Sequence, residues 1–284
     1  MRFLYNELPA GEIKLFHSSV APGKRVYHEH HHTDCELSYV LSGGGVYSVL
    51  NKELTFSSGD LFLFGPDEIH CITNVLPNEK FELINIHFDP RLLWGGGDTA
   101  YLKLLKLFND RSTVFSNKVP VLRKDKAEIQ AFFSETEAEL TQKMPGYDMK
   151  VRLLLYSCLL ILYRNCGLVN PSAAETPHSS ELLTLLSSAV SYINTHLSDD
   201  LTLDKIAAEA HLSRAYFSTL FKKYNGITPF EYITIKRVEK AIEYLKTTDL
   251  SKLEIASLCG FNSSANFYKA FSKVTGKKPG DYIF

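Results

Sequence analysis

The last third of the chain contains one pattern written twice, and this repeat constrains the fold more than any other feature. The first copy runs from Ile206 to Ile233 and the second from Ile255 to Ile283. Corresponding residues lie 49 positions apart before a central turn and 50 apart after it, so one residue is inserted behind the turn. A supersecondary unit repeated within a chain indicates two modules of the same kind.

The first copy has the marks of a helix-turn-helix. Apolar residues at i, i+3, i+4 and i+7 define one face of its first helix: Leu203, Ile206, Ala207 and Ala210. A short turn follows at His211-Leu212, and Ser213 is placed to cap a second helix. That helix carries Phe217 and Phe221 on its inner face and ends at Gly226.

The second copy repeats these signals. It opens with the capping box from Ser251 to Glu254, turns at Gly260, and carries Phe267 and Phe271 on its inner face. In a helix-turn-helix the second helix enters the DNA major groove, while basic residues hold phosphates. One copy alone would fit an ordinary helical domain equally well, but two copies at matched spacing favour DNA binding. The expected DNA-binding residues are Arg214, Ala215, Ser218, Thr219, Lys222, Ser264, Ala265, Tyr268, Lys269 and Lys273.

The second copy contains the run Ile255-Ala256-Ser257-Leu258-Cys259-Gly260-Phe261 and then Phe267, Phe271, Gly276, Pro279 and Tyr282. In these residues it resembles the signature region of the AraC/XylS family of bacterial transcription regulators, and the resemblance covers roughly residues 183 to 284. It implies two helix-turn-helix units joined by a rigid helix from Pro229 to about Lys246. Such a helix spans about 25 Å, which suits recognition helices in successive major grooves about 34 Å apart. Lys252 stands where the family usually has an apolar residue, so we expect Leu250 or Leu253 to fill the gap.

Length and charge allow an ordinary soluble protein of about two domains. The 284 residues carry a net charge of −1, but the part from Glu181 onward has 13 Lys and Arg against 11 Asp and Glu. A weakly basic domain contributes a modest electrostatic term, so tight operator binding is expected to need a dimer. Five scattered cysteines without a CxxC pair fit the bacterial cytoplasm. No signal peptide and no membrane span are expected, since the longest apolar run, Leu153 to Tyr163, is too short.

In residues 1 to 97, apolar residues recur at every second position, which is the period of a β-strand. Short alternating runs at 36–41, 46–50, 54–56, 61–64 and 81–88 are separated by turns rich in Gly and Asn, which is typical of a sandwich or barrel. The expected fold class is therefore α+β multidomain, with an N-terminal β-barrel and a C-terminal all-α double helix-turn-helix domain.

Histidines concentrate in two places of this segment. His30-x-His32-x₃-Glu36-x₆-Gly43, with Gly59 to Pro66 and His70-x₃-Asn74, resembles the two cupin motifs, although Asp67-Glu68 replace a customary Gly. The resemblance implies a barrel with an effector pocket, for which the candidates are His30, His32, Glu36, His70, Tyr39 and Tyr47. Imidazoles with a carboxylate suit a divalent first-row metal, so His30, His32, Glu36 and His70 are candidate metal ligands. Bound metal, a metal-free effector pocket and a rim without a ligand remain open alternatives.

Residues 98–166 are expected to form helices that couple and dimerise, and residues 167–180 to form a linker. Helices are expected at 101–109, 125–142 and 148–165, and the last is apolar on nearly all sides, so it must be buried. In the AraC/XylS family paired helices after the barrel dimerise; packing within one chain is the alternative. Residues 181–284 are assigned to the DNA-binding domain, with its motifs at about 201–226 and 251–276.

The preferred hypothesis is a non-enzymatic, sequence-specific transcription regulator. It would bind double-stranded DNA as a homodimer and respond to a small effector, for which the family analogy suggests a carbohydrate. RNA polymerase is a further candidate partner, and a membrane is not. Two alternatives are a metal-dependent cupin enzyme with an accessory DNA-binding module, and a constitutive DNA-binding dimer whose barrel is structural.

Overall fold

A computed structural model describes residues 13–20, 29–77, 80–97, 101–112, 115–169 and 177–282. Its contacts divide the chain into two compact units, one formed by Ile13–Ser180 and one that contains Glu181–Phe284. The first unit is built on antiparallel sheets and the second is helical, so the expected α+β class is confirmed. Part of the predicted linker, residues 170–176, lies outside the described residues. Within the described part, no helix is long and apolar enough to cross a bilayer.

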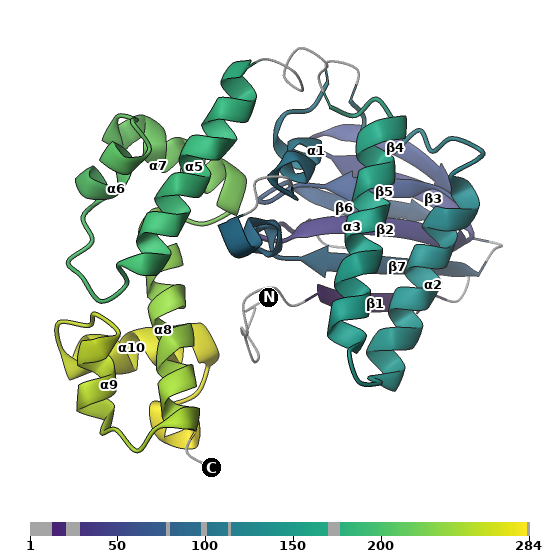
Figure 1. The fold of residues 1–284 in the computed structure, drawn as a ribbon. Helices are drawn as coiled ribbons and strands as arrows, with labels where there is room; N and C mark the ends of the chain where they lie inside the picture. The colour runs from purple at the N-terminus through teal and green to yellow at the C-terminus, as the bar shows by residue number, and fades with distance from the viewer. Residues whose placement is uncertain are drawn as a thin grey trace. The chain divides into compact units, whose positions relative to one another are not determined.

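Two sheets form the body of the first unit (Figure 1). One sheet has the order β1-β7-β2-β5 and the other β4-β3-β6, with every pair antiparallel. The strands are β1 (Ile13–Val20), β2 (Cys35–Ser42), β3 (Gly44–Val49), β4 (Lys52–Ser57), β5 (Leu61–Phe64), β6 (His70–Val75) and β7 (Phe81–Phe88). Sequence periodicity predicted five of these strands; β1 and β6 were missed.

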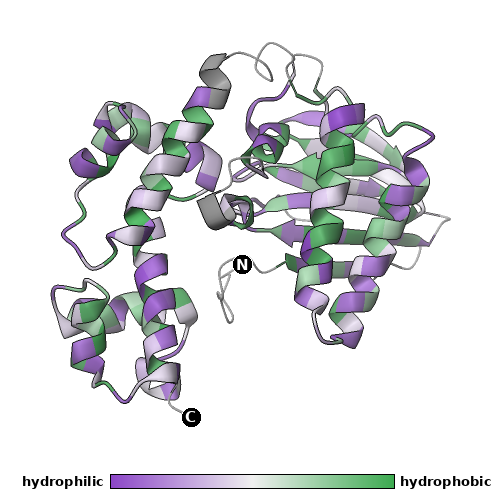
Figure 2. Cartoon of the chain, in the orientation of Figure 1, coloured by the Kyte–Doolittle hydropathy of each residue, from purple (hydrophilic) through white to green (hydrophobic). Residues whose placement is uncertain are grey.

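Inward side chains from both sheets share one aromatic core. Its buried members are Val40, Tyr47, Val49, Phe56, Phe62, Phe64, Ile72, Phe81 and Leu83. Figure 2 shows the strands of this unit largely in the green of apolar residues. Because aromatic rings fill the space between the sheets, a ligand site in this unit has to lie at the end of the core and not in its middle.

Helices follow the strands, and two of them, α2 and α3, lie across the face of the larger sheet (Figure 1). The helices are η1 (Pro90–Gly97), η2 (Tyr101–Leu105), α1 (Lys106–Asn109), α2 (Lys126–Gln142) and α3 (Tyr147–Asn165). Helices α2 and α3 pack against each other, and Tyr39 of β2 stacks on Phe133 of α2 with ring centroids 5.0 Å apart. The three helical stretches expected here are therefore present within a few residues of their predicted bounds.

The second unit repeats one arrangement of helices. Its elements are α5 (Pro177–Thr195), α6 (Leu203–Glu209), α7 (Arg214–Asn225), α8 (Pro229–Thr247), α9 (Lys252–Leu258), α10 (Ser264–Thr275) and η3 (Pro279–Tyr282). Helices α6 and α7 form the first helix-turn-helix, α9 and α10 form the second, and α8 connects them. Thr228 and Glu231 close a capping box at the start of α8, and Pro229 occupies its first turn.

Candidate functional site

Two features carry chemistry: a cluster of histidines at the end of the barrel core and the exposed faces of α7 and α10. In the cluster, Glu36 lies on β2 opposite His87 of β7, as a directly paired cross-strand couple. The backbone of His30 bridges that of His70, the first residue of β6. Pairing between strands therefore gathers side chains that are far apart in sequence.

One carboxylate oxygen lies at the centre of this cluster. Glu36 Oε2 is 2.9 Å from His32 Nε2, 3.1 Å from His70 Nε2 and 3.2 Å from His87 Nε2. The side chains of His32, His70 and Glu36 are 7%, 2% and 1% exposed, so water contributes little to solvating them. One ligand atom each from His30, His32, Glu36 and His70 lies within 4.8 Å of the other three. The structure thus brings all four predicted metal ligands together.

Backbone carbonyls fix the protons of two of these rings. His32 Nδ1 lies 2.9 Å from the carbonyl oxygen of Asp34, and His70 Nδ1 lies 2.8 Å from that of Glu68. A carbonyl oxygen can only accept, so each Nδ1 donates its proton. In a neutral ring the Nε2 then presents a lone pair, and in both histidines it faces an oxygen that is itself an acceptor. This arrangement requires positive charge between the rings and the carboxylate, supplied either by extra protons or by a cation.

The pKa directions agree with that requirement. Burial alone lowers the pKa of His32, but the hydrogen bond and the charge of Glu36 outweigh it and raise that pKa above its ordinary value. Burial alone raises the pKa of Glu36, but the hydrogen bonds from His32, His70 and His87 hold it well below its usual range. Without a cation, both directions favour a charged pair of His32 and Glu36.

The donors fit a divalent transition metal. Atoms that share one such ion at bonds of about 2.0–2.2 Å lie roughly 2.9–3.4 Å apart for bond angles near 90–109°. Glu36 Oε2 lies 2.9 Å from His32 Nε2 and 3.1 Å from His70 Nε2, which is within that range and is also the length of a hydrogen bond, and all four candidate ligand atoms lie within 4.8 Å of one another. Glu36 Oε1 is buried and has no hydrogen-bond partner among the described residues, which leaves one more donor atom. His30, His32, Glu36 and His70 would hold the ion.

The rest of the predicted pocket lies elsewhere. Tyr39 and Glu36 are three residues apart on β2, so their side chains point to opposite faces, and Tyr39 stacks on α2. Tyr47 is 2% exposed within the aromatic core, and its hydroxyl lies 2.9 Å from Ser38 Oγ, which donates to Asn85 Oδ1. His28, a further histidine of the first motif region, lies outside the described residues.

A partly buried ion pair behind the cluster holds the loop before β6. Arg111 contacts both carboxylate oxygens of Glu68 at 2.8 Å, and the backbone N–H of Gly65 and the amide of Asn117 donate to the same carboxylate. Asp67 takes a left-handed backbone with φ 60° where the cupin pattern has its Gly. Because the Glu68 carbonyl accepts from His70, this network orients the ring of one candidate metal ligand.

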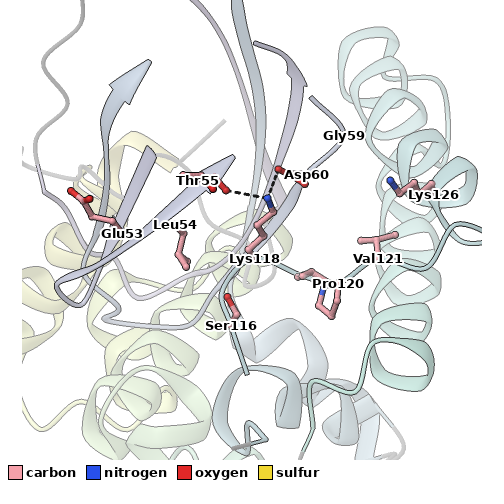
Figure 3. Close-up of a pocket in the computed structure, with 11 residues that line it drawn as sticks. Glu53, Leu54, Thr55, Gly59, Asp60, Ser116, Lys118, Pro120, Val121 and Lys126 are labelled. Atoms are coloured by element: carbon pink, nitrogen blue, oxygen red, sulfur yellow. Dashed lines mark hydrogen bonds and ion pairs between the residues drawn. The ribbon is translucent and has the colours of Figure 1, made fainter. Parts of the chain in front are cut away.

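A cavity of about 510 Å³ opens outside the core, away from the histidine cluster (Figure 3). It lies between β4 and the segment 116–121, and none of the predicted pocket residues lines it. Figure 3 shows Lys118 pointing at Thr55 and Asp60, and Lys126 on the opposite wall. The Lys118 ammonium is 2.7 Å from the Asp60 carboxylate and donates to the Thr55 carbonyl at 3.0 Å, so it ties the two sheets together.

The two helix-turn-helix copies have the same local geometry. Both second helices start at a serine cap, Ser213 for α7 and Ser263 for α10, and both end at a left-handed Gly. In the turns, the N–H of Leu212 donates to the carbonyl of Ala207, and the N–H of Phe261 to that of Ala256. Both hydrogen bonds fall at the offset of 49 read from the sequence.

Every residue predicted to contact DNA lies on an accessible face of its helix. Ser218 and Ser264 are half-buried, and the other eight predicted residues are exposed. Arg214 also pairs with Asp204 at 3.5 Å, with both side chains largely in solvent. Tyr216 and Asn266 were not predicted, but both are exposed in the first turn of α7 and α10 at the offset of 50. Their matched positions in the repeat could have revealed them.

The central helix is fixed to the segment before α6. Arg237 of α8 donates to the carbonyl oxygens of Leu197 at 2.9 Å and Asp199 at 2.8 Å. The turn at Gly260, with φ 80°, lies so close to the Leu197 carbonyl that a Cβ there would be 2.4 Å away. The segment before α6 and the turn at Gly260 are thereby tied to α8.

The expectation that Leu250 or Leu253 would replace the missing apolar residue at Lys252 is wrong. Leu250 is 38% exposed and Leu253 is 66% exposed. Lys252 itself is half-buried, with its ammonium close to Gly280 of η3. The aliphatic part of the lysine fills the place while its charge reaches the surface.

Family models match both halves of the chain. A helix-turn-helix domain model matches residues 206–283, and a cupin domain model matches residues 16–87. The first match covers most of the repeated helices of the second unit. The second match covers every residue of the histidine cluster, including His87 at its last position.

The chain is similar to known regulators. It is 39% identical over 107 residues to the regulatory protein PocR of Salmonella typhimurium, which covers 38% of the chain but only 34% of PocR. It is 26% identical over 262 residues to the transcriptional activator RhaR of Escherichia coli K12, covering 90% of the chain and 87% of RhaR. The DNA-binding domain of AdpA, solved in complex with a target DNA, is 31% identical with a TM-score of 0.34, covering 34% of this chain and 88% of that one.

Both family models agree with the doubled motif and the two-sheet domain described above. The match to RhaR covers 90% of the chain and therefore extends over both units. The chain therefore belongs to the AraC/XylS family of transcription regulators, with a cupin domain before its DNA-binding domain.

Proposed function

We propose that this regulator recognises a specific double-stranded DNA sequence with α7 and α10, and that the barrel adjusts this recognition by binding a ligand at the histidine cluster. The observation that carries the proposal is the repeated exposed surface. Both helices offer the same positions to solvent, each behind a serine cap and a fixed turn. Because α8 joins the two motifs rigidly, both helices can enter successive major grooves on one face of the duplex.

The test begins with selection of the preferred duplex from a random library by the full chain. Binding to that duplex and to a scrambled one is then measured by fluorescence anisotropy at several salt concentrations. We expect a strong preference for the selected sequence and an affinity that falls steeply with salt, since phosphate contacts release counterions. Equal affinity for both duplexes at physiological salt would refute the proposal.

Single substitutions then separate base reading from charge. Thr219→Ala and Lys269→Ala each remove one exposed group from a recognition helix, and loss of a base contact costs about 1–3 kcal/mol of discrimination. Lys52→Ala, an exposed lysine on β4 of the other unit, removes the same charge and serves as the control. Both recognition-helix variants should lose sequence preference, and the control should keep it.

For the barrel we propose a divalent transition metal held by His30, His32, Glu36 and His70. The opposed lone pairs, the partnerless Glu36 Oε1 and the ligand-like separations support this ligand over a carbohydrate inside the core, which aromatic rings fill. We propose binding without turnover, so that the ion acts by stabilising one state of the barrel. It changes operator affinity only if it binds the two states of the regulator unequally.

The ligand proposal is tested on chelator-treated protein. Addition of Zn²⁺, Ni²⁺ or Co²⁺ should raise the temperature of thermal unfolding, because an ion that binds the native state stabilises it. The same addition should alter operator affinity in the anisotropy assay. A panel of sugars serves as the alternative arm; stabilisation by a sugar and by no metal would refute the metal ligand while leaving DNA recognition intact.

We further propose that α3 forms a homodimer. Met149, Leu153 and Leu160 follow one another at i, i+4 and i+11 and are 67%, 60% and 38% exposed. The expected burial of this apolar helix is therefore incomplete within one chain. Intervals of four and then seven residues are those of the apolar positions in a coiled coil. The exposed face of α3 formed by these residues is therefore suited to packing against α3 of a second copy. A dimer would place four recognition helices on one operator.

A further inference from the structure

The histidine cluster contains a member that the cupin pattern does not include. His87 is the seventh residue of β7, more than fifty residues after Glu36, and no motif points to it. Its backbone pairs with Glu36 on one side and with Lys14 of β1 on the other. Cross-strand partners in an antiparallel pair project to the same face, so His87 and Glu36 enter the cluster together.

His87 lies about as close to Glu36 as His32 and His70 do. Its Nε2 is 3.2 Å from Glu36 Oε2, against 2.9 Å for His32 and 3.1 Å for His70. Its ring lies 4.4 Å from the ring of His32, and its side chain is only 13% exposed. The ring of Phe16 contacts it edge-on at 4.9 Å and limits its rotation. A buried, oriented imidazole at ligand distance is a candidate donor in its own right.

We propose that His87 is an additional nitrogen ligand of the metal site, which then draws on four imidazoles and one carboxylate. This inference rests on the proposed metal binding. A nitrogen-rich donor set favours ions that prefer imidazole, such as Zn²⁺, Ni²⁺, Cu²⁺ and Co²⁺, over Mg²⁺ and Mn²⁺, which prefer oxygen. It also fills coordination positions that a metalloenzyme keeps open for its substrate. The site is therefore one that retains its ion, as a sensor or a structural centre does.

The same polar face continues along the strands beyond His87. Asn85, two residues before it, accepts from Ser38, two residues after Glu36. These pairs form a polar row beside an aromatic core, and the row leads from the core to the cluster. His87 is thus held by the same strand pairing that positions Glu36, and its placement does not depend on the loop that carries His30 and His32.

The test compares Co²⁺ binding by wild-type, His87→Asn and His17→Asn full-length proteins after chelator treatment. His17 lies on neighbouring β1 and is 37% exposed, with its ring against Glu137 outside the cluster, so it is the matched control. Visible absorption of bound Co²⁺ reports the number and type of ligands, and competition with a chromophoric chelator gives the affinity for Zn²⁺ and Mn²⁺.

We expect His87→Asn to change the Co²⁺ spectrum, to weaken Zn²⁺ binding by about 10- to 100-fold or more, and to narrow the preference for Zn²⁺ over Mn²⁺. His17→Asn should match the wild type in all three. Far-UV circular dichroism confirms that each metal-free variant is folded, and His87→Gln repeats the test if the asparagine variant is not.

An unchanged Co²⁺ spectrum in a folded His87 variant, at whatever affinity, would overturn the ligand role. Failure of the wild type to bind any of these ions would overturn both this inference and the proposed metal ligand. Neither result touches the DNA-binding proposal, because operator recognition is measured separately with the same proteins.

Discussion

Substitution of Gly260 by Ala tests the claim that both recognition helices are held by one rigid frame. Gly260 has φ 80°, a conformation that costs an L-residue about 1–2 kcal/mol. The new Cβ would also lie 2.4 Å from the Leu197 carbonyl and 2.9 Å from Arg237 Nη2. Overpacking of this kind typically costs about 1–3 kcal/mol. We therefore expect Gly260→Ala to lower the free energy of unfolding of the second unit by about 2–5 kcal/mol.

The control is Gly276→Ala at the end of α10, where φ is 71° but the residue is exposed. It carries the backbone cost at an exposed position, so it should lower the free energy of unfolding by only about 1–2 kcal/mol. Urea unfolding is followed by far-UV circular dichroism, to which the helices of both units contribute, and by the fluorescence of Trp94, the single tryptophan, which reports the first unit alone. Equal destabilisation by the two substitutions would refute the tight approach of this turn to Leu197.

Two further predictions concern the first unit. Burial alone raises the pKa of Glu68, but the hydrogen bond and charge of Arg111 outweigh burial and hold that pKa below the ordinary 4.5. The ion pair therefore stabilises the fold fully above pH 4.5, and this stabilisation is lost as the pH falls through the lowered pKa. Wild-type protein should lose more stability than Glu68→Gln between pH 7 and pH 3.5 in urea unfolding, and parallel losses would contradict this. Leu153→Glu should shift the protein from dimer to monomer in sedimentation equilibrium. The control Leu122→Glu adds the same charge at a loop position that is 44% exposed and should leave the dimer intact. A dimer retained in both variants would exclude α3 as the interface.

Local signals predicted the DNA-binding unit well because its determinants are local. Ser213 and Ser251 cap helices as expected, and Gly226 ends α7 in the left-handed conformation that favours glycine. These motifs span a few residues and are independent of distant parts of the chain. Lys252 shows the limit: the way its stem fills a gap beside η3 depends on packing that no local pattern encodes.

The candidate metal site was predicted only in part because strand pairing completes it. Spacing identified His30, His32, Glu36 and His70, but His87 joins them solely through the register of β2 and β7. The sequence does contain a signal for His87, since Asn85 and His87 are polar residues two apart that alternate with apolar neighbours in β7. Strict alternation would also have separated Tyr39 from Glu36, because residues three apart face opposite sides.

Strands β1 and β6 were missed for similar reasons. The sequence of β1, Ile13–Val20, mixes polar and apolar residues without a clean period of two. Strand β6 begins at His70 of the second histidine motif, and its sequence, His70–Val75, does not alternate cleanly between polar and apolar residues. In both cases the partner strand, β7 or β3, supplies the stability that the segment's own composition does not indicate.

The central claim is that α7 and α10 read one duplex together across a fixed separation. The most direct measurement is anisotropy with the selected operator and with the same operator carrying an insertion of about 5 base pairs, half a helical turn, between the two contacted segments. The account predicts that the insertion abolishes specific binding and leaves only the salt-dependent affinity for scrambled DNA. Unchanged affinity for the lengthened operator would contradict it.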